Sequence, residues 1–209
     1  MSRNYTQRKP SEYNLFRTVF TWLTCNLVYG LYYTLFCNLK VIGRQNVPKK
    51  GFFIVASNHV SAIDPFLVVF AIRRIAAYMA KKELFETRAG RIFLNLLGAF
   101  AVNREKLEVS TIKTAIAIKQ TNWVLGLFPQ GTREIDGNME HISRGFAAIA
   151  KITKSDILPV KITGATKEER KPFKGNMKII IGKPIPYNDD THKMVDLWIK
   201  QMSELDKGE

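Results

Sequence analysis

The sequence predicts an α/β protein with a mostly parallel or mixed central sheet of about seven strands, flanked by helices and preceded by an N-terminal membrane-associated helix. Three observations predict this architecture. Short apolar runs alternate with stretches in which apolar residues recur at helical spacing, as in β-α units. The composition, 46% hydrophobic and 24% charged over 209 residues, is that of a chain that can bury a core. Finally, the segment 18–39 runs 22 residues without a charge.

The first predicted element is the helix over 18–39. Its length matches the roughly 20 residues that cross the apolar core of a bilayer. Three arrangements stay open: a helix that spans the membrane, one that lies in its interface, and one that covers the domain. Polar residues such as Thr24 and Asn26 weaken the spanning arrangement, and aromatic residues suit the interface.

Basic charge is concentrated around this helix. Residues 1–50 hold eight lysines and arginines against one acid, Glu12, in a chain whose net charge is +14. A positive field attracts anionic lipid, phosphorylated substrates or nucleic acid. We therefore expect a membrane-associating segment in 1–38, a globular domain in 39–209, and a protein bound to the cytoplasmic face of a membrane.

The rest of the chain is predicted as strands and helices in alternation. Each expected strand is a short apolar run, and each expected helix carries apolar residues at helical spacing. In order, the strands are 39–42, 52–56, 75–79, 99–102, 124–128, 157–162 and 177–181, and the helices are 65–72, 83–97, 107–120, 145–153 and 191–205.

The loops that follow the strands are where functional groups are expected, because a rigid sheet positions them and helix starts offer free N–H donors. Three such loops have unusual sequences: residues 57–65, 103–104 and 129–133. They are predicted to meet at one edge of the sheet.

His59 and Asp64 are the candidate catalytic pair. Asp64-Pro65 has the sequence of a helix start, with Asp64 as the predicted N-cap. His59 stands five residues earlier in the same loop, so a carboxylate can hold one imidazole nitrogen and leave the other as a base. Ser61 lies between them, but the nucleophile elbow of a hydrolase needs flanking glycines that Ser61 lacks.

Arginines follow two other strands. Arg104 ends the run 98–104, and Arg133 ends Gln130-Gly131-Thr132-Arg133, a turn that can expose backbone N–H groups. Arginine suits phosphate oxygens, so these residues predict an anion pocket beside the His59 base. We interpret His141 and His192 as incidental, Cys25 and Cys37 as packing residues, and expect no metal site.

These blocks resemble those of the 1-acyl-sn-glycerol-3-phosphate acyltransferases. Residues 58–65 match the N-H-x-x-x-x-D block, 98–104 resemble the second block, and 128–133 resemble the third, usually F-P-E-G-T-R. A fourth apolar block resembles 157–160. Gln130 stands where the family normally has Glu, and Asn103 replaces a frequent Asp.

The resemblance implies an enzyme in which His59 deprotonates an acceptor hydroxyl and Asp64 orients the imidazole. The acceptor would be lysophosphatidate, acylated at its free sn-2 hydroxyl to phosphatidic acid for phospholipid biosynthesis. Arg104 and Arg133, with Gln130, Gly131 and Thr132, would bind its phosphate and head group. The donor would be acyl-CoA or acyl-carrier protein as co-substrate, with no cofactor.

Two rival functions stay open. The Gln130 departure allows an acyltransferase of another lyso-lipid, such as a lyso-aminolipid or a remodelled lysophospholipid. A non-catalytic basic protein of a membrane surface or of nucleic acid would also explain the charge. Aromatic residues interleaved with the basic ones are sparse outside the N-terminal helix, so nucleic acid is not the expected partner.

Overall fold

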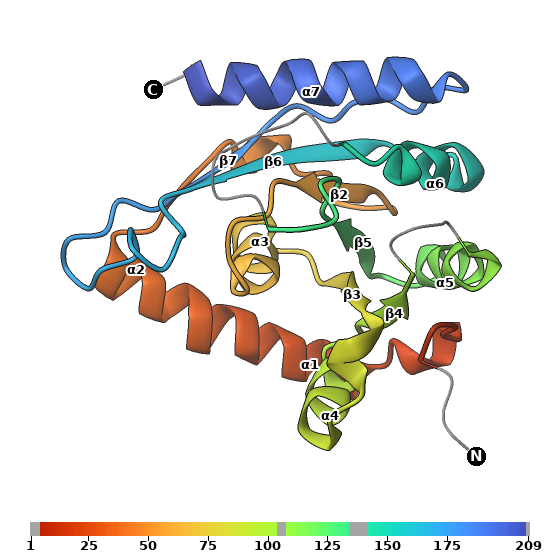
Figure 1. The fold of residues 1–209 in the computed structure, drawn as a ribbon, viewed down its shortest axis with the longest axis horizontal. Coiled ribbons are helices and arrows are strands. Elements are labelled where there is room, and N and C mark those ends of the chain that lie inside the picture. The colour runs from red at the N-terminus through yellow and green to blue at the C-terminus, as the bar shows by residue number, and fades with distance from the viewer. Residues whose placement is uncertain (1–4, 104–107, 134–141, 208–209) are drawn as a thin grey trace.

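The computed structural model describes residues 5–103, 108–133 and 142–207, and its centre is a seven-stranded sheet (Figure 1). The strand order is β1-β7-β6-β2-β5-β3-β4, with every neighbouring pair parallel except the antiparallel β6 and β7. The predicted α/β class and mixed sheet are confirmed. The strands are β1 Lys40–Ile42, β2 Ile54–Ser57, β3 Ala76–Lys81, β4 Phe100–Val102, β5 Val124–Leu127, β6 Ile157–Thr163 and β7 Lys178–Ile181.

Helices cover both faces of the sheet. The long N-terminal helix and α3 lie on one side, and α5, α6 and α7 lie on the other (Figure 1). The predicted helix 83–97 is two pieces, a 3-10 turn at Lys82–Phe85 and then α4, because Thr87 caps a new helix by accepting from Gly90 N. The helices are α1 Leu15–Leu23, α2 Leu31–Cys37, α3 Asp64–Ile72, α4 Arg88–Leu96, α5 Val109–Lys119, α6 Gly145–Thr153 and α7 Thr191–Lys207.

The central strands β2 and β5 are buried along their whole length, because helices cover both faces of the sheet there. Along β2, Val55 packs into the core under α3 and the N-terminal helix, while Ile54 and Ala56 pack into the core under α5, α6 and α7. Strands of this kind show no polar alternation, so a short apolar run is their only sequence signal.

The N-terminal helix runs from Leu15 to Cys37 as α1, a π-helical segment Thr24–Gly30 and α2. Its inner side packs on α3 so closely that a Cβ on Gly30 would meet the ring of Phe70. The outer side exposes large apolar side chains. Within the described residues no helix is both long enough and apolar enough to cross a membrane. The predicted helix is present, and its contact with a membrane stays a prediction.

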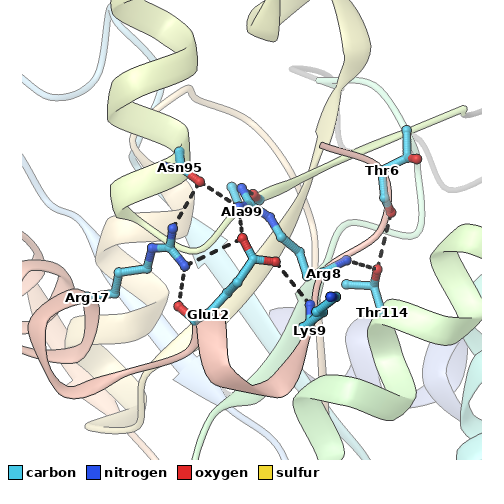
Figure 2. A network of polar contacts seen from close by, with 8 residues as sticks. All are labelled: Thr6, Arg8, Lys9, Glu12, Arg17, Asn95, Ala99 and Thr114. Atoms are coloured by element: carbon cyan, nitrogen blue, oxygen red, sulfur yellow. Dashed lines mark hydrogen bonds and ion pairs between the residues drawn. The ribbon is translucent and has the colours of Figure 1, made fainter. Parts of the chain in front are cut away.

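Two buried arginines, Arg8 before α1 and Arg17 within it, hold the N-terminal segment against the rest of the domain (Figure 2). Arg8 donates to Glu12 at 3.1 Å, to the side chain of Asn95 at 2.5 Å and to the carbonyl of Ala99 at 2.6 Å. Arg17 donates to the same Asn95 oxygen at 3.1 Å. Burial raises the pKa of Glu12, but the hydrogen bond from the Lys9 backbone and the charges of the two arginines together lower it by more, so the net effect is a lowered pKa. The network joins the N-terminal arm to α4 and β4, although the predicted boundary between 1–38 and 39–209 stays a prediction.

Candidate active site

The loop between β2 and α3 brings His59 and Asp64 together. The Nδ1 atom of His59 lies 2.8 Å from Oδ2 of Asp64. The expected helix start is present, but the N-cap assignment was wrong: Ile63 is the N-cap and Asp64 is the first residue of α3. The Asp64 side chain turns back into the loop, since it accepts hydrogen bonds there instead of capping the helix.

The Asp64 carboxylate organises the whole loop. Its Oδ2 accepts from the backbone N–H groups of Val60 and Ser61, both at 2.7 Å, in addition to the His59 ring. The side chain is fully buried. A buried carboxylate held by three donors fixes the ring tautomer, with the proton on Nδ1 and Nε2 left as the basic nitrogen.

Two amide side chains hold the loop against neighbouring strands. Asn58 pairs twice with the backbone of Ile162 in β6, through bonds of 2.8 and 2.7 Å. Gln130, from the loop after β5, accepts from the His59 backbone N–H at 2.9 Å. The sequence predicted Gln130 as a head-group contact. That contact stays a prediction; the structure shows that the buried Gln130 side chain holds the His59 backbone through its amide oxygen and so positions the loop.

The imidazole of His59 is stacked on an aromatic column. Phe128 lies against it with ring centroids 3.9 Å apart and planes 14° apart, and Tyr78 lies against Phe128 at 5.3 Å. The Tyr78 ring stands over Gly126 in β5, where any Cβ would clash. Burial raises the pKa of Tyr78 well above its usual value, so the column is uncharged. Sequence reasoning did not find this column, because Tyr78 and Gly126 meet only through the register of β3 on β5.

A large cavity opens beside the His59 ring. Its volume is about 480 Å³ and most of its lining is apolar. The lining includes Thr21, Cys25 and Tyr29 from the N-terminal helix and Phe93 from α4. The N-terminal helix is therefore part of the wall of the site. A largely apolar cavity of this volume suits a hydrocarbon chain.

A second, smaller cavity of about 120 Å³ shares His59 and Phe128 with the first. Its other lining residues include Asn103, Gly131 and Ser143, from the ends of β4 and β5 and the start of α6. Two cavities thus meet at the same imidazole. Two reactants could approach one base from separate sites.

The predicted anion-binding residues are only partly described. Arg133 is exposed and lines the large cavity together with His59. Gly131 has φ +72°, a left-handed conformation that favours glycine, and Thr132 is exposed. Arg104 lies outside the described residues, so the pairing of two arginines stays a prediction.

Wherever the structure describes them, the remaining histidines and cysteines make no contact with the His59–Asp64 pair. His192 is exposed and its Nε2 contacts Arg144 at 2.9 Å, while His141 lies outside the described residues. Cys25 and Cys37 are free and buried, and burial raises the pKa of the Cys25 thiol to about 12. Among the described residues no three His, Cys, Asp or Glu side chains gather as metal ligands would.

Comparison with known proteins finds related chains. The sequence model of the family described as Acyltransferase matches residues 38–163. The chain is 34% identical over 155 residues to the 1-acyl-sn-glycerol-3-phosphate acyltransferase of Bacillus subtilis (strain 168), covering 74% of this chain and 77% of that relative. It is 31% identical over 124 residues to the protein of the same name from Borreliella burgdorferi, covering 58% of this chain and 50% of that relative.

A solved structure shares the fold. The crystal structure of the 1-acyl-sn-glycerophosphate acyltransferase PlsC from Thermotoga maritima aligns with a TM-score of 0.73 at 24% identity, over 91% of this chain and 80% of that one. At this identity the likeness concerns the fold alone. The matched family region 38–163 contains His59, Asp64 and Gln130.

Proposed function

This chain belongs to the acyltransferase family, and we propose that it acylates the free sn-2 hydroxyl of 1-acyl-glycerol-3-phosphate, giving phosphatidic acid for phospholipid synthesis. The observation that carries the proposal is the contact of His59 with a buried carboxylate at the point where two cavities meet. That arrangement supplies one base and two places for substrates. The relatives named for this reaction support the choice of acceptor.

In the proposed reaction His59 is the general base. Its Nε2 takes the proton of the acceptor hydroxyl as the oxygen attacks the thioester carbonyl of the donor. The tetrahedral intermediate then expels the thiolate, which receives that proton from the imidazolium. Asp64 holds Nδ1–H throughout and stabilises the transient positive ring. No acyl-enzyme forms, and the thioester, from acyl-CoA or acyl-carrier protein, is a co-substrate.

The acceptor phosphate is proposed to lie near the guanidinium of Arg133, with Arg104 as its predicted partner. Holding the phosphate fixes the distance from the hydroxyl to Nε2, and such positioning can lower a barrier by several kcal/mol. Gly131 and Thr132, between Gln130 and Arg133, lie close enough in sequence to contribute backbone donors. Gln130 would act indirectly, through the His59 backbone.

The large apolar cavity is proposed to take an acyl chain. Its lining by the N-terminal helix suggests a route from lipid, because the outer side of that helix exposes Leu15, Phe16, Trp22 and other apolar residues. The polar residues of the helix also suit an apolar surrounding. Each of Thr18, Thr24, Asn26 and Thr34 donates its side-chain hydrogen bond to a carbonyl four residues earlier.

We propose that this outer side lies in the interface of a membrane on the cytoplasmic side. An interfacial helix buries one apolar face at the depth of the lipid headgroups and needs no span of the bilayer. The basic residues of the N-terminal quarter would attract anionic lipid.

One assay tests acceptor and donor together. Purified protein in detergent is incubated with lysophosphatidate and either oleoyl-CoA or oleoyl-acyl-carrier protein, and products are identified by mass spectrometry. Wild type is expected to form phosphatidic acid, and His59→Ala to form none while keeping its fold by circular dichroism. Wild-type turnover by His59→Ala would falsify the base assignment, and a covalent acyl adduct lost in Ser61→Ala would replace it with a serine nucleophile.

The acylation of another lyso-lipid is the second candidate. It is motivated by Gln130 in place of the usual Glu. In the structure the Gln130 side chain accepts a hydrogen bond from the His59 backbone, so the replacement of Glu by Gln directly affects how the His59 loop is held in place. Lysophosphatidylcholine and lysophosphatidylethanolamine offered in competition with lysophosphatidate discriminate the two: preference for either one favours the second candidate.

A further inference from the structure

The loop between β6 and β7 carries an unusual residue. Phe173 is 82% exposed, the most exposed of the large apolar side chains in the described residues. It also has φ +61°, in the left-handed region that a residue with a bulky side chain rarely adopts. The exposure of an aromatic ring and the strained backbone each lower the stability of the fold. Such strain concentrates at functional positions.

Several contacts fasten this loop to the end of the N-terminal helix. The Phe173 backbone N–H donates to the Phe36 carbonyl at 2.6 Å, and the two rings meet edge to face at 5.6 Å. The Arg170 guanidinium donates to the Tyr33 hydroxyl at 3.0 Å. A Cβ on Gly175 would lie 2.8 Å from the Cys37 carbonyl, so loop and helix end are in close contact. Phe173 therefore extends the exposed apolar side of α2.

The charges around Phe173 are mainly positive. Lys167, Lys171 and Lys174 are exposed, whereas one of the two nearby acids, Glu169, is engaged by the hydroxyl of Thr166 at 2.7 Å. An aromatic ring rimmed by lysines fits the boundary of an anionic bilayer: the ring enters the headgroup layer and the ammonium groups meet phosphates.

We propose that this loop is a second membrane contact, in which Phe173 inserts into an anionic lipid surface beside α2 and the lysines bind its headgroups. The proposal rests on the proposed function, which requires the enzyme to take its acceptor from a membrane. The occupant is a lipid surface because Phe173 is continuous with the exposed apolar residues of α2, such as Leu35 and Phe36. The loop adds an anchor at the end of the helix.

Vesicle binding tests the contact. Full-length protein is titrated with vesicles of 30% phosphatidylglycerol in phosphatidylcholine and with vesicles of phosphatidylcholine alone, and bound protein is measured by flotation. We expect Phe173→Ser to weaken binding to the anionic vesicles about tenfold. Lys171→Gln/Lys174→Gln should weaken it by a similar factor and reduce the preference for anionic lipid. The matched control is Ile152→Ser, which removes a 46% exposed apolar side chain from α6 on the other face of the sheet.

A second measurement reports directly on whether the side chain at position 173 enters the lipid. In the double variant Trp22→Phe/Phe173→Trp the introduced indole is the exposed one, since Trp123 and Trp198 are buried. Its emission should shift to the blue on addition of anionic vesicles and be quenched by brominated lipid. The absence of both signals, or wild-type binding by Phe173→Ser, overturns the proposal.

Acyl transfer in detergent micelles separates this result from the proposed function. The Phe173, Lys171 and Lys174 variants should keep wild-type turnover there, because none of these residues lines either cavity. Absence of transfer in the wild type refutes the proposed function. Normal transfer with unchanged vesicle binding of the variants refutes the loop contact alone.

Discussion

Replacing Asp64 with asparagine is the most informative perturbation of the site. Oδ2 of Asp64 accepts three hydrogen bonds, from the His59 ring and from the backbone of Val60 and Ser61. Asparagine keeps an oxygen of the same size in that place. Alanine would leave both backbone N–H groups without their acceptor at about 1–3 kcal/mol each, so a loss of activity could simply reflect unfolding.

The magnitude follows from the three contacts. A hydrogen bond to a charged acceptor contributes about 1.5–3 kcal/mol, and one to a neutral acceptor about 1 kcal/mol. Three bonds therefore lose about 3 kcal/mol in Asp64→Asn. The other carboxylate oxygen, Oδ1, is buried and has no hydrogen-bond partner in the described part of the chain, so an amide nitrogen there adds an unpaired donor. At about 2–4 °C per kcal/mol for a chain of this length, the loss of about 3 kcal/mol lowers the Tm by about 6–12 °C.

The catalytic effect should be much larger than the loss of stability suggests. A neutral amide neither selects the ring tautomer with Nε2 unprotonated nor stabilises the imidazolium, and the equivalent change in a serine protease triad lowers kcat by about 10⁴. We expect kcat/KM to fall by about 10³–10⁴. Initial rates are measured well below the Tm of the variant, with thermal melts by circular dichroism in the same detergent.

One outcome refutes this reasoning directly. A folded Asp64→Asn protein with kcat/KM within tenfold of wild type means that Asp64 only braces the loop. His59→Ala is the companion variant: it removes the base but leaves the two backbone bonds to Asp64 in place, so its Tm should change less than that of Asp64→Asn.

Three further expectations concern residues around the dyad. Arg133→Ala should raise the KM for lysophosphatidate by about tenfold or more and also lower kcat, because a bond to phosphate is lost and the acceptor hydroxyl is positioned less well; an unchanged KM places the phosphate elsewhere. Gln130→Ala should lower kcat about tenfold, since the His59 N–H loses its acceptor, whereas Gln130→Glu keeps an acceptor and should retain activity; equal kcat in both variants and wild type contradicts a positioning role. Burial raises the pKa of Cys25 to about 12 and also raises that of Cys37, so iodoacetamide at about pH 8 should alkylate neither thiol in the native protein and both in denaturant; a rapid mass increase of the native protein contradicts this.

The fold was predictable because its signals are local. Each strand is a short apolar run, and α6 was predicted with its observed bounds, 145–153. What the sequence did not reveal depends on spacing in three dimensions. The strand order and the antiparallel entry of β7 follow from pairing between segments far apart in the sequence. The interruption before α4, by contrast, is a local signal that was missed in the sequence, because Thr87 caps the new helix by accepting from Gly90 N.

The contact of His59 with Asp64 was predictable for the same reason, since the two residues stand five positions apart in one loop. The contacts that hold their loop in place were not predictable from the sequence. Asn58 reaches Ile162 across 104 positions and Gln130 reaches His59 across 71. The N-cap assignment of Asp64 was wrong because two sets of nearby N–H donors compete for the carboxylate. It accepts from Val60 and Ser61 in the preceding loop instead of from the first turn of the helix.

The N-terminal helix lies between the large cavity and the proposed membrane contact. Its inner residues Thr21, Cys25 and Tyr29 line the large cavity, while its outer residues, among them Trp22 and Leu31, are exposed. A helix with its side chains is about 10 Å across, so only that thickness separates the cavity from whatever the outer side touches. If the outer side lies in lipid as proposed, an acyl chain passes from bilayer to cavity around a single helix, without crossing bulk water. A charged substitution on the outer side should then weaken transfer from vesicles and spare transfer from micelles, whereas one at Thr21 should impair both.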